Sequence, residues 1–162
     1  MIPVHVHGVA LLPPHETPVM LLREISGARR WLPISIGSPE AVALVAACEQ
    51  LANARPDTVE LIGQVLAAFG RQVQCVEVTA LDADVFFAEL VLDNGLRVSA
   101  RPSDAVAIGV RADAPLQVAE SVLATAATEL KVVEDDPEQQ IAEFRGQLDE
   151  VTPEDFEGPP SG

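Results

Sequence analysis

The chain has 162 residues, 48% hydrophobic and only 4% aromatic, which suits one domain with an aliphatic core and a short appendage. Its formal net charge is −15, and residues 129–162 hold 11 acidic but only 2 basic residues. Such acidity disfavours broad, nonspecific nucleic-acid binding, which depends on neutralising many phosphates. Any contact with nucleic acid must therefore use a local arginine cluster. No apolar run reaches the length of a membrane span and the N-terminus has no signal-like core, so we expect a cytoplasmic protein with no membrane partner.

The first half of the chain is predicted to begin with three strands. Alternating apolar and polar residues, separated by turn residues, place these strands over 4–12, 19–25 and 31–36. A helix is expected next, over 41–51, with Ser38 as a candidate N-cap. Because this helix is apolar nearly all round, we expect it to be buried.

A second, amphipathic helix is predicted after the break at Arg55-Pro56. Asp57 and Glu60 have the spacing of a capping box at its start, and Gly70 ends it. Further strands, a helix, a short strand and a last helix follow at 73–81, 85–92, 96–100, 102–110, 116–118 and 120–127.

One short phrase occurs twice. Residues 38–44 read Ser-Pro-Glu-Ala-Val-Ala-Leu, and residues 102–108, 64 positions later, read Pro-Ser-Asp-Ala-Val-Ala-Ile. Each copy follows three predicted strands and begins a helix. The expected fold is therefore α+β, with an internally duplicated β-β-β-α unit forming a mixed, barrel-like sheet with packed helices.

The predicted domain spans residues 1–130. Residues 131–162 are expected to form an acidic linker and a short amphipathic helix with a frayed end, because acidic residues cluster after Lys131 and apolar ones then recur every three or four positions.

A group of charged residues stands near the predicted helix starts and could carry chemistry. Carboxylates can hold a divalent cation such as Mg²⁺ or Mn²⁺, and arginines can grip phosphate oxygens in pairs. The candidates are Asp104, Glu60 and Ser103 as catalytic residues, Asp104, Glu60 and Glu40 as metal ligands, and Arg55, Arg101 and Arg111 as phosphate-binding residues. The alternative is structural: the acids cap helices and the arginines form ion pairs.

Several of these residues lie in blocks that resemble the bifunctional nuclease domain family. The blocks are Leu32-Pro33-Ile34-Ser35-Ile36-Gly37 with Glu40-Ala41, Arg55-Pro56-x-Thr58, and Arg101-Pro102-Ser103-Asp104-Ala105-Val106-Ala107-Ile108 with Arg111. The resemblance covers about residues 3–126. It implies a compact α+β domain with internal duplication, a homodimer, and nuclease activity on DNA and RNA.

The chain departs from the family pattern at three positions. The family usually reads Arg-Pro-x-Thr-His-Asp-Leu, whereas this chain has Val59 and Glu60 at the histidine and aspartate. The family often has an acid two residues before Arg101, where this chain has Ser99. Valine can serve neither as a base nor as a metal ligand, so the resemblance implies a weakened or altered site.

Two functions are open at this point. The first is a metal-dependent nuclease that cleaves phosphodiester bonds of DNA and RNA. The second is a non-enzymatic, dimeric regulatory or ligand-binding module, which the net charge and the missing histidine and aspartate equivalents favour.

Overall fold

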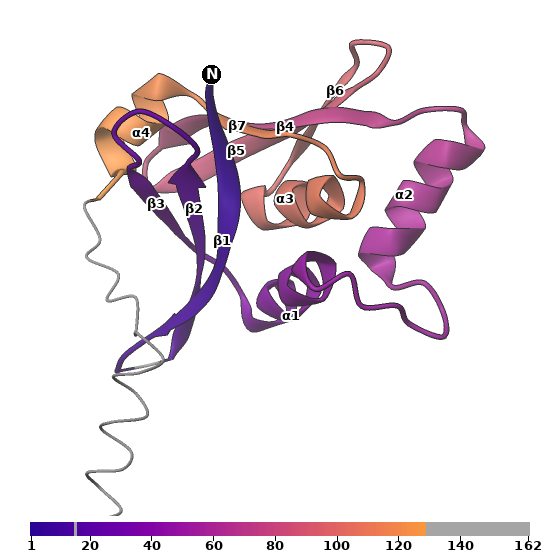
Figure 1. Cartoon of the computed structure of the whole chain (residues 1–162), viewed down its shortest axis with the longest axis horizontal. Helices are drawn as coiled ribbons and strands as arrows, with labels where there is room; N and C mark the ends of the chain where they lie inside the picture. The colour runs from indigo at the N-terminus through magenta and orange to yellow at the C-terminus, as the bar shows by residue number, and fades with distance from the viewer. Residues whose placement is uncertain (15, 129–162) are drawn as a thin grey trace, which may run out of the picture. The chain divides into compact units, whose positions relative to one another are not determined.

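The computed structural model describes residues 1–14 and 16–128, which form the predicted α+β fold (Figure 1). The acidic linker and C-terminal helix predicted for residues 131–162 lie outside this range. Its elements, in chain order, are β1 Ile2–Leu12, β2 Thr17–Glu24, β3 Trp31–Ser35, α1 Ser38–Cys48, α2 Thr58–Ala68, β4 Val73–Asp82, β5 Val85–Leu92, β6 Arg97–Ala100, α3 Pro102–Arg111, β7 Leu116–Val118 and α4 Glu120–Ala126.

The seven described strands form one mixed sheet in the order β3-β2-β1-β7-β4-β5-β6. Each half of the chain supplies an antiparallel three-stranded meander, and β7 lies between them. β7 pairs antiparallel with β1 and parallel with β4. Because β3 and β6 are the two edges of the described sheet, the sheet is open, and the expected barrel-like closure is not found. Three strands followed by a helix do occur in both halves, but sequence duplication stays a prediction.

The core lies between the sheet and the helices. α1 and α3 contact each other, α1 contacts β1 and β2, and α3 contacts β4 and β5 (Figure 1). Aliphatic side chains fill this space, as the composition predicts. The largest fully buried ones are Met20, Leu22, Leu32, Leu44, Leu123, Val76, Val78, Val106, Val118 and Val122.

α1 differs from its prediction in two ways. Its N-cap is Gly37 rather than Ser38, and no side chain caps it. A Cβ at Gly37 would overlap the carboxylate of Glu40, so a larger residue here would require that side chain to move. The helix also buries only one face, because Leu44 is fully buried whereas Val42 is 70% exposed.

α2 begins as predicted: the Asp57 side chain accepts a hydrogen bond from the Glu60 N–H, and the Glu60 side chain accepts one from the Asp57 N–H. None of its residues is buried, however. The helix stands at the side of the domain and exposes one apolar face, with Phe69 79% exposed (Figure 1). Its opposite face packs on the core through residues that include Val59 and Ile62.

Glu24 is a buried carboxylate with a built-in partner. Arg30 donates two side-chain hydrogen bonds and its backbone N–H to this carboxylate, and it also bonds Glu120 at the start of α4. The hydrogen bonds from Arg30 hold the pKa of Glu24 below its ordinary value. The arginine therefore keeps a buried charge paired and fastens the β2–β3 hairpin to α4.

Two glycines offer a matched test of how closely α3 packs against β4 and β7. A Cβ at Gly109 would overlap the Val76 side chain and lie 3.3 Å from Leu116 Cδ2, whereas a Cβ at Gly63 in α2 would meet nothing within 4 Å. Gly109→Ala should lower the free energy of unfolding by about 1–3 kcal/mol through overpacking. Gly63→Ala should raise it by roughly 0.5–1 kcal/mol through helix propensity. Urea denaturation of both variants checks this; equal effects would contradict the packing of α3 against β4 and β7.

Candidate functional site

Glu40 and Asp104 occupy the third residue of α1 and of α3, and one arginine joins them. Arg101 Nε lies 2.6 Å from Asp104 Oδ2, and its Nη2 lies 3.0 Å from Asp104 Oδ1. Its Nη1 lies 3.0 Å from Glu40 Oε1. The doubled phrase thus places two equivalent carboxylates side by side, and the structure brings together three of the residues that the sequence singled out.

Each of these two helices begins at the cluster without a side-chain cap. The N-caps are Gly37 in α1, which has no side chain, and Arg101 in α3, whose side chain makes no capping hydrogen bond to the helix backbone. The backbone N–H groups of a first helical turn have no intrahelical acceptor, and they carry the positive end of the helix dipole. Two uncapped helix N-termini therefore meet at the Glu40–Arg101–Asp104 group, hereafter the arginine cluster.

Ser103, the second residue of α3, lies beside this cluster. The residue is only 7% exposed, and among the side-chain hydrogen bonds within residues 1–14 and 16–128 none involves its hydroxyl. Its neighbours in a cavity of about 290 Å³ include Gly37, Glu40 and Arg101. The cavity thus holds a hydroxyl that is still able to bond a ligand.

A second cavity, of about 620 Å³, lies on another side of the cluster and also contains both carboxylates. It is lined by Pro39, Glu40, Ala43, Thr58, Val59, Ile62, Leu90, Val98, Ser99, Ala100, Arg101, Asp104 and Ile108. Val59 and Ser99, two of the three positions that depart from the expected family pattern, both line this cavity. A histidine and an acid at these positions would therefore lie in the wall around Asp104, which makes this cavity a candidate site.

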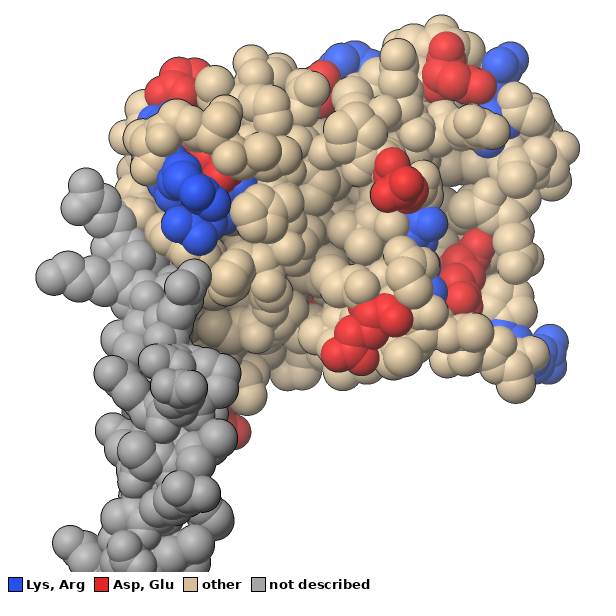
Figure 2. All heavy atoms as spheres, in the orientation of Figure 1, with Lys and Arg blue, Asp and Glu red and all other residues tan. Residues whose placement is uncertain are grey.

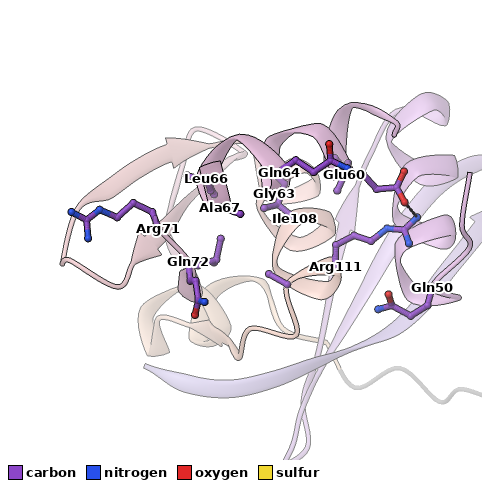
Figure 3. A pocket seen from close by; sticks show the side chains of 13 residues that line it. Gln50, Glu60, Gly63, Gln64, Leu66, Ala67, Arg71, Gln72, Ile108 and Arg111 are labelled. Carbon is purple, nitrogen blue, oxygen red and sulfur yellow. Dashed lines mark ion pairs between the residues drawn. The ribbon is translucent and has the colours of Figure 1, made fainter. Parts of the chain in front are cut away.

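Glu60 and Arg111 form a separate group (Figure 3). Arg111 Nη2 lies 2.8 Å from the Leu51 carbonyl oxygen and 3.7 Å from Glu60 Oε1. Its side chain is only 12% exposed. Glu60 already serves the α2 capping box. Both residues line a third cavity, of about 630 Å³, to which Asp104 does not contribute. This position suits a structural tie between the α1–α2 loop, α2 and α3.

Arg55 takes no part in either group. It is exposed in the loop before α2, and its side chain forms no ion pair with the described part of the chain. The three candidate phosphate-binding arginines thus occupy three different places. Of the three, only Arg101 lies at the N-termini of α1 and α3.

The ligand set for a divalent cation is incomplete at the cluster. Within residues 1–14 and 16–128 no three His, Cys, Asp or Glu side chains come together closely enough to hold a metal ion. Glu40 and Asp104 are close neighbours, but both are bonded to Arg101, whose pKa is raised first by its hydrogen bonds to Asp104 and then by Glu40. A cation held by these two carboxylates would have to displace a permanently charged guanidinium.

The surface charge agrees with a local rather than a broad anion site. On the face shown in Figure 2, acidic and basic side chains alternate in small groups, with no continuous basic stripe. None of the described helices is long and apolar enough to cross a lipid bilayer.

The two arginines should behave differently when replaced. Arg111→Gln removes a nearly buried group that satisfies the Leu51 carbonyl, so the free energy of unfolding should fall by about 1–3 kcal/mol. Arg101→Gln changes an exposed side chain (65%) and should leave the melting temperature nearly unchanged. Thermal denaturation distinguishes them, and a large loss of stability in Arg101→Gln would show that the cluster is primarily structural.

Comparison with other proteins agrees with these motifs. The family model described as the bifunctional nuclease domain matches residues 20–131. A protein of Mycobacterium tuberculosis strain H37Rv, described as uncharacterized, is 38% identical over 94% of this chain and 96% of its own length. Bifunctional nuclease 1 of Arabidopsis thaliana is 32% identical, and Bifunctional nuclease 2 of Oryza sativa subsp. japonica is 30% identical. Each plant match covers 65% of this chain but only 34% of the plant protein. The chain belongs to the bifunctional nuclease domain family.

Proposed function

We propose that the protein is a nuclease that hydrolyses phosphodiester bonds of DNA and RNA, with the arginine cluster as its site. The observation that carries the proposal is the meeting of Glu40, Arg101 and Asp104 at two uncapped helix N-termini. Carboxylates, a guanidinium and free N–H donors are the groups that phosphodiester hydrolysis needs. The names of the plant relatives support the same reaction class.

The proposed roles follow from the position of each residue. The first-turn N–H groups of α3 and the Arg101 guanidinium would bind the phosphate and stabilise the added charge of the transition state. Asp104 or Glu40 would accept a proton from the attacking water. Ser103 would orient the phosphate or the water. Val59 supplies no base where relatives have histidine, so we expect slow turnover.

A divalent cation, Mg²⁺ or Mn²⁺, remains part of this proposal. Glu40 and Asp104 would hold it, and it would supply charge for the phosphate and a more acidic water. Glu60 would join this set only if α2 gave up its capping box, so we leave Glu60 and Arg111 outside the proposed catalytic group.

The nuclease proposal is tested by Asp104→Ala. Cleavage of labelled single-stranded DNA and RNA, measured with and without Mn²⁺, should fall at least a hundredfold, because general-base catalysis contributes roughly 10²–10⁴-fold. Asp113→Ala is the matched control, since Asp113 lies beyond the end of α3 and outside both cluster cavities; it should cleave at the wild-type rate.

The comparison requires that both variants have the melting temperature of the wild-type protein, so that a loss of activity does not reflect unfolding. Cleavage that survives Asp104→Ala in a rigorously purified sample would come from another site or a contaminant and would refute the assignment. Activity that is unchanged by chelators would refute the cation while leaving the site in place.

The second candidate function is a regulatory or ligand-binding module, and the cavity of about 630 Å³ favours it. Gln50, Gln64, Gln72 and Arg71 line this cavity together with the apolar side chains of Leu66 and Val73 (Figure 3). A cavity lined by both amide and apolar groups suits a small polar ligand. Binding of small ligands by a protein that shows no cleavage at all would favour this candidate.

We also propose that the protein is a homodimer that uses the exposed face of α2. Leu61, Val65 and Phe69 are exposed on this helix, and Glu60 is the only charged residue between Thr58 and Gly70. Two copies of a chain with a net charge of −15 repel each other least where the surface is uncharged. A cytoplasmic location remains proposed, supported by two cysteines that are both free thiols.

Phe69→Glu tests the dimer. Its charge should stop two α2 helices from meeting and give a monomer by size-exclusion chromatography with light scattering. Leu11→Glu, at an exposed position of β1, is the control and should remain dimeric. A wild-type protein that is monomeric at high micromolar concentration would rule out the proposed interface.

A further inference from the structure

In the arginine cluster, carboxylates occupy the N–H groups of Arg101 that a phosphate would use. The three guanidinium nitrogens of Arg101 are all within 3.0 Å of carboxylate oxygens, two of Asp104 and one of Glu40. A phosphate also binds arginine best through two parallel N–H groups. Asp104 already occupies the parallel N–H pair of Nε and Nη2, so a phosphate that takes this pair has to displace Asp104, and one that takes Nη1 has to compete with Glu40.

We propose that Arg101 binds a phosphate of a nucleic acid. In the free protein Glu40 and Asp104 occupy its guanidinium group, and the incoming phosphate displaces these carboxylates from it. The proposal rests on the site of the proposed nuclease and names the group that it binds as a backbone phosphate of the nucleic acid. It adds a form of regulation, because the two carboxylates become free to act only when the phosphate has taken the arginine.

The cavity around Ser103 is where the freed arginine and the phosphate would meet. Ser103 is 7% exposed as a residue, its hydroxyl makes no hydrogen bond within the described residues, and it lines this cavity beside Arg101. The uncapped first turns of α1 and α3 begin at the same place. A hydroxyl donor, N–H donors and a guanidinium are complementary to phosphate oxygens.

Exposure makes the exchange feasible. Arg101 is 65% exposed and Asp104 41% exposed, whereas Glu40 is only 21% exposed. Ion pairs at such positions are weak, because water screens them. An incoming phosphate therefore has to overcome only a small attraction, and in return it gains charge-assisted hydrogen bonds.

The proposal predicts that removing a carboxylate from the cluster raises the affinity for an oligonucleotide. Glu40→Gln removes one competitor, so affinity for an oligonucleotide should rise roughly threefold, as expected for the loss of one weak ion pair. Arg101→Gln removes the receptor, so affinity should fall about tenfold. In the double variant Glu40 has nothing left to compete for, so its affinity should equal that of Arg101→Gln alone.

The experiment is a double-mutant cycle by fluorescence anisotropy. The probe is a labelled phosphorothioate decathymidylate at low salt with a chelator present, so that binding is measured without cleavage. The wild type, the two single variants and the double variant are compared after thermal denaturation has shown that their melting temperatures are equal. Ser103→Ala is added and should weaken binding about twofold to threefold.

Glu77→Gln is the matched control. Glu77 and Glu89 flank Arg97 much as Glu40 and Asp104 flank Arg101, and the change in net charge is the same. Because none of these three residues lines the Ser103 cavity, Glu77→Gln should leave oligonucleotide affinity unchanged.

Three results would overturn the proposal. One is an equal gain in Glu77→Gln, which would reduce the effect to net charge. Another is a gain from Glu40→Gln that persists in the double variant, which would mean that Glu40 acts independently of Arg101. The third is unchanged affinity in Arg101→Gln. The cycle is independent of turnover: if it holds and no variant cleaves, the nuclease proposal fails while the phosphate receptor stands.

Discussion

The short strand β7 is the constraint on which the rest of the domain depends. Leu116 and Val118 pair with β1 on one side and with β4 on the other, so three residues join two separate meanders into one sheet. Both side chains are buried, which commits them to the core as well as to the sheet. Without β7, each meander would present an unpaired inner strand, and an exposed strand edge is a liability in water.

Joining the meanders is also what assembles the site. α1 follows one meander and α3 follows the other, so the two helices become neighbours only when β7 has aligned the halves. Their first turns then lie together, and Arg101 from the second half reaches Glu40 from the first. The cluster is thus a product of the sheet topology. One arginine is paired with both carboxylates there, and in the proposed reaction the same pairing would withhold the groups that act on the phosphate.

Local sequence patterns predicted the helices and strands well, but they did not predict which residues lie together in the fold. The capping box of α2 appears in the structure because it depends on residues a few positions apart. Glu60 was expected beside Asp104 but lies with Arg111, because a capping carboxylate is held at its own helix end. The helix at 41–51 was expected to be buried but leaves Val42 exposed, since periodicity alone cannot say which face of an apolar helix meets the sheet.

The sequence by itself determined the α+β class, the order of the elements, the family motifs and the importance of the block from Arg101 to Asp104. These follow from local hydrogen bonding, hydrophobic periodicity and short-range motifs. Only the tertiary structure decided which charged residues meet: that Arg101 bridges Glu40 and Asp104, that Val59 and Ser99 share one cavity, and that the sheet stays open. Long-range contacts are set by how the faces pack, and no local pattern records that choice.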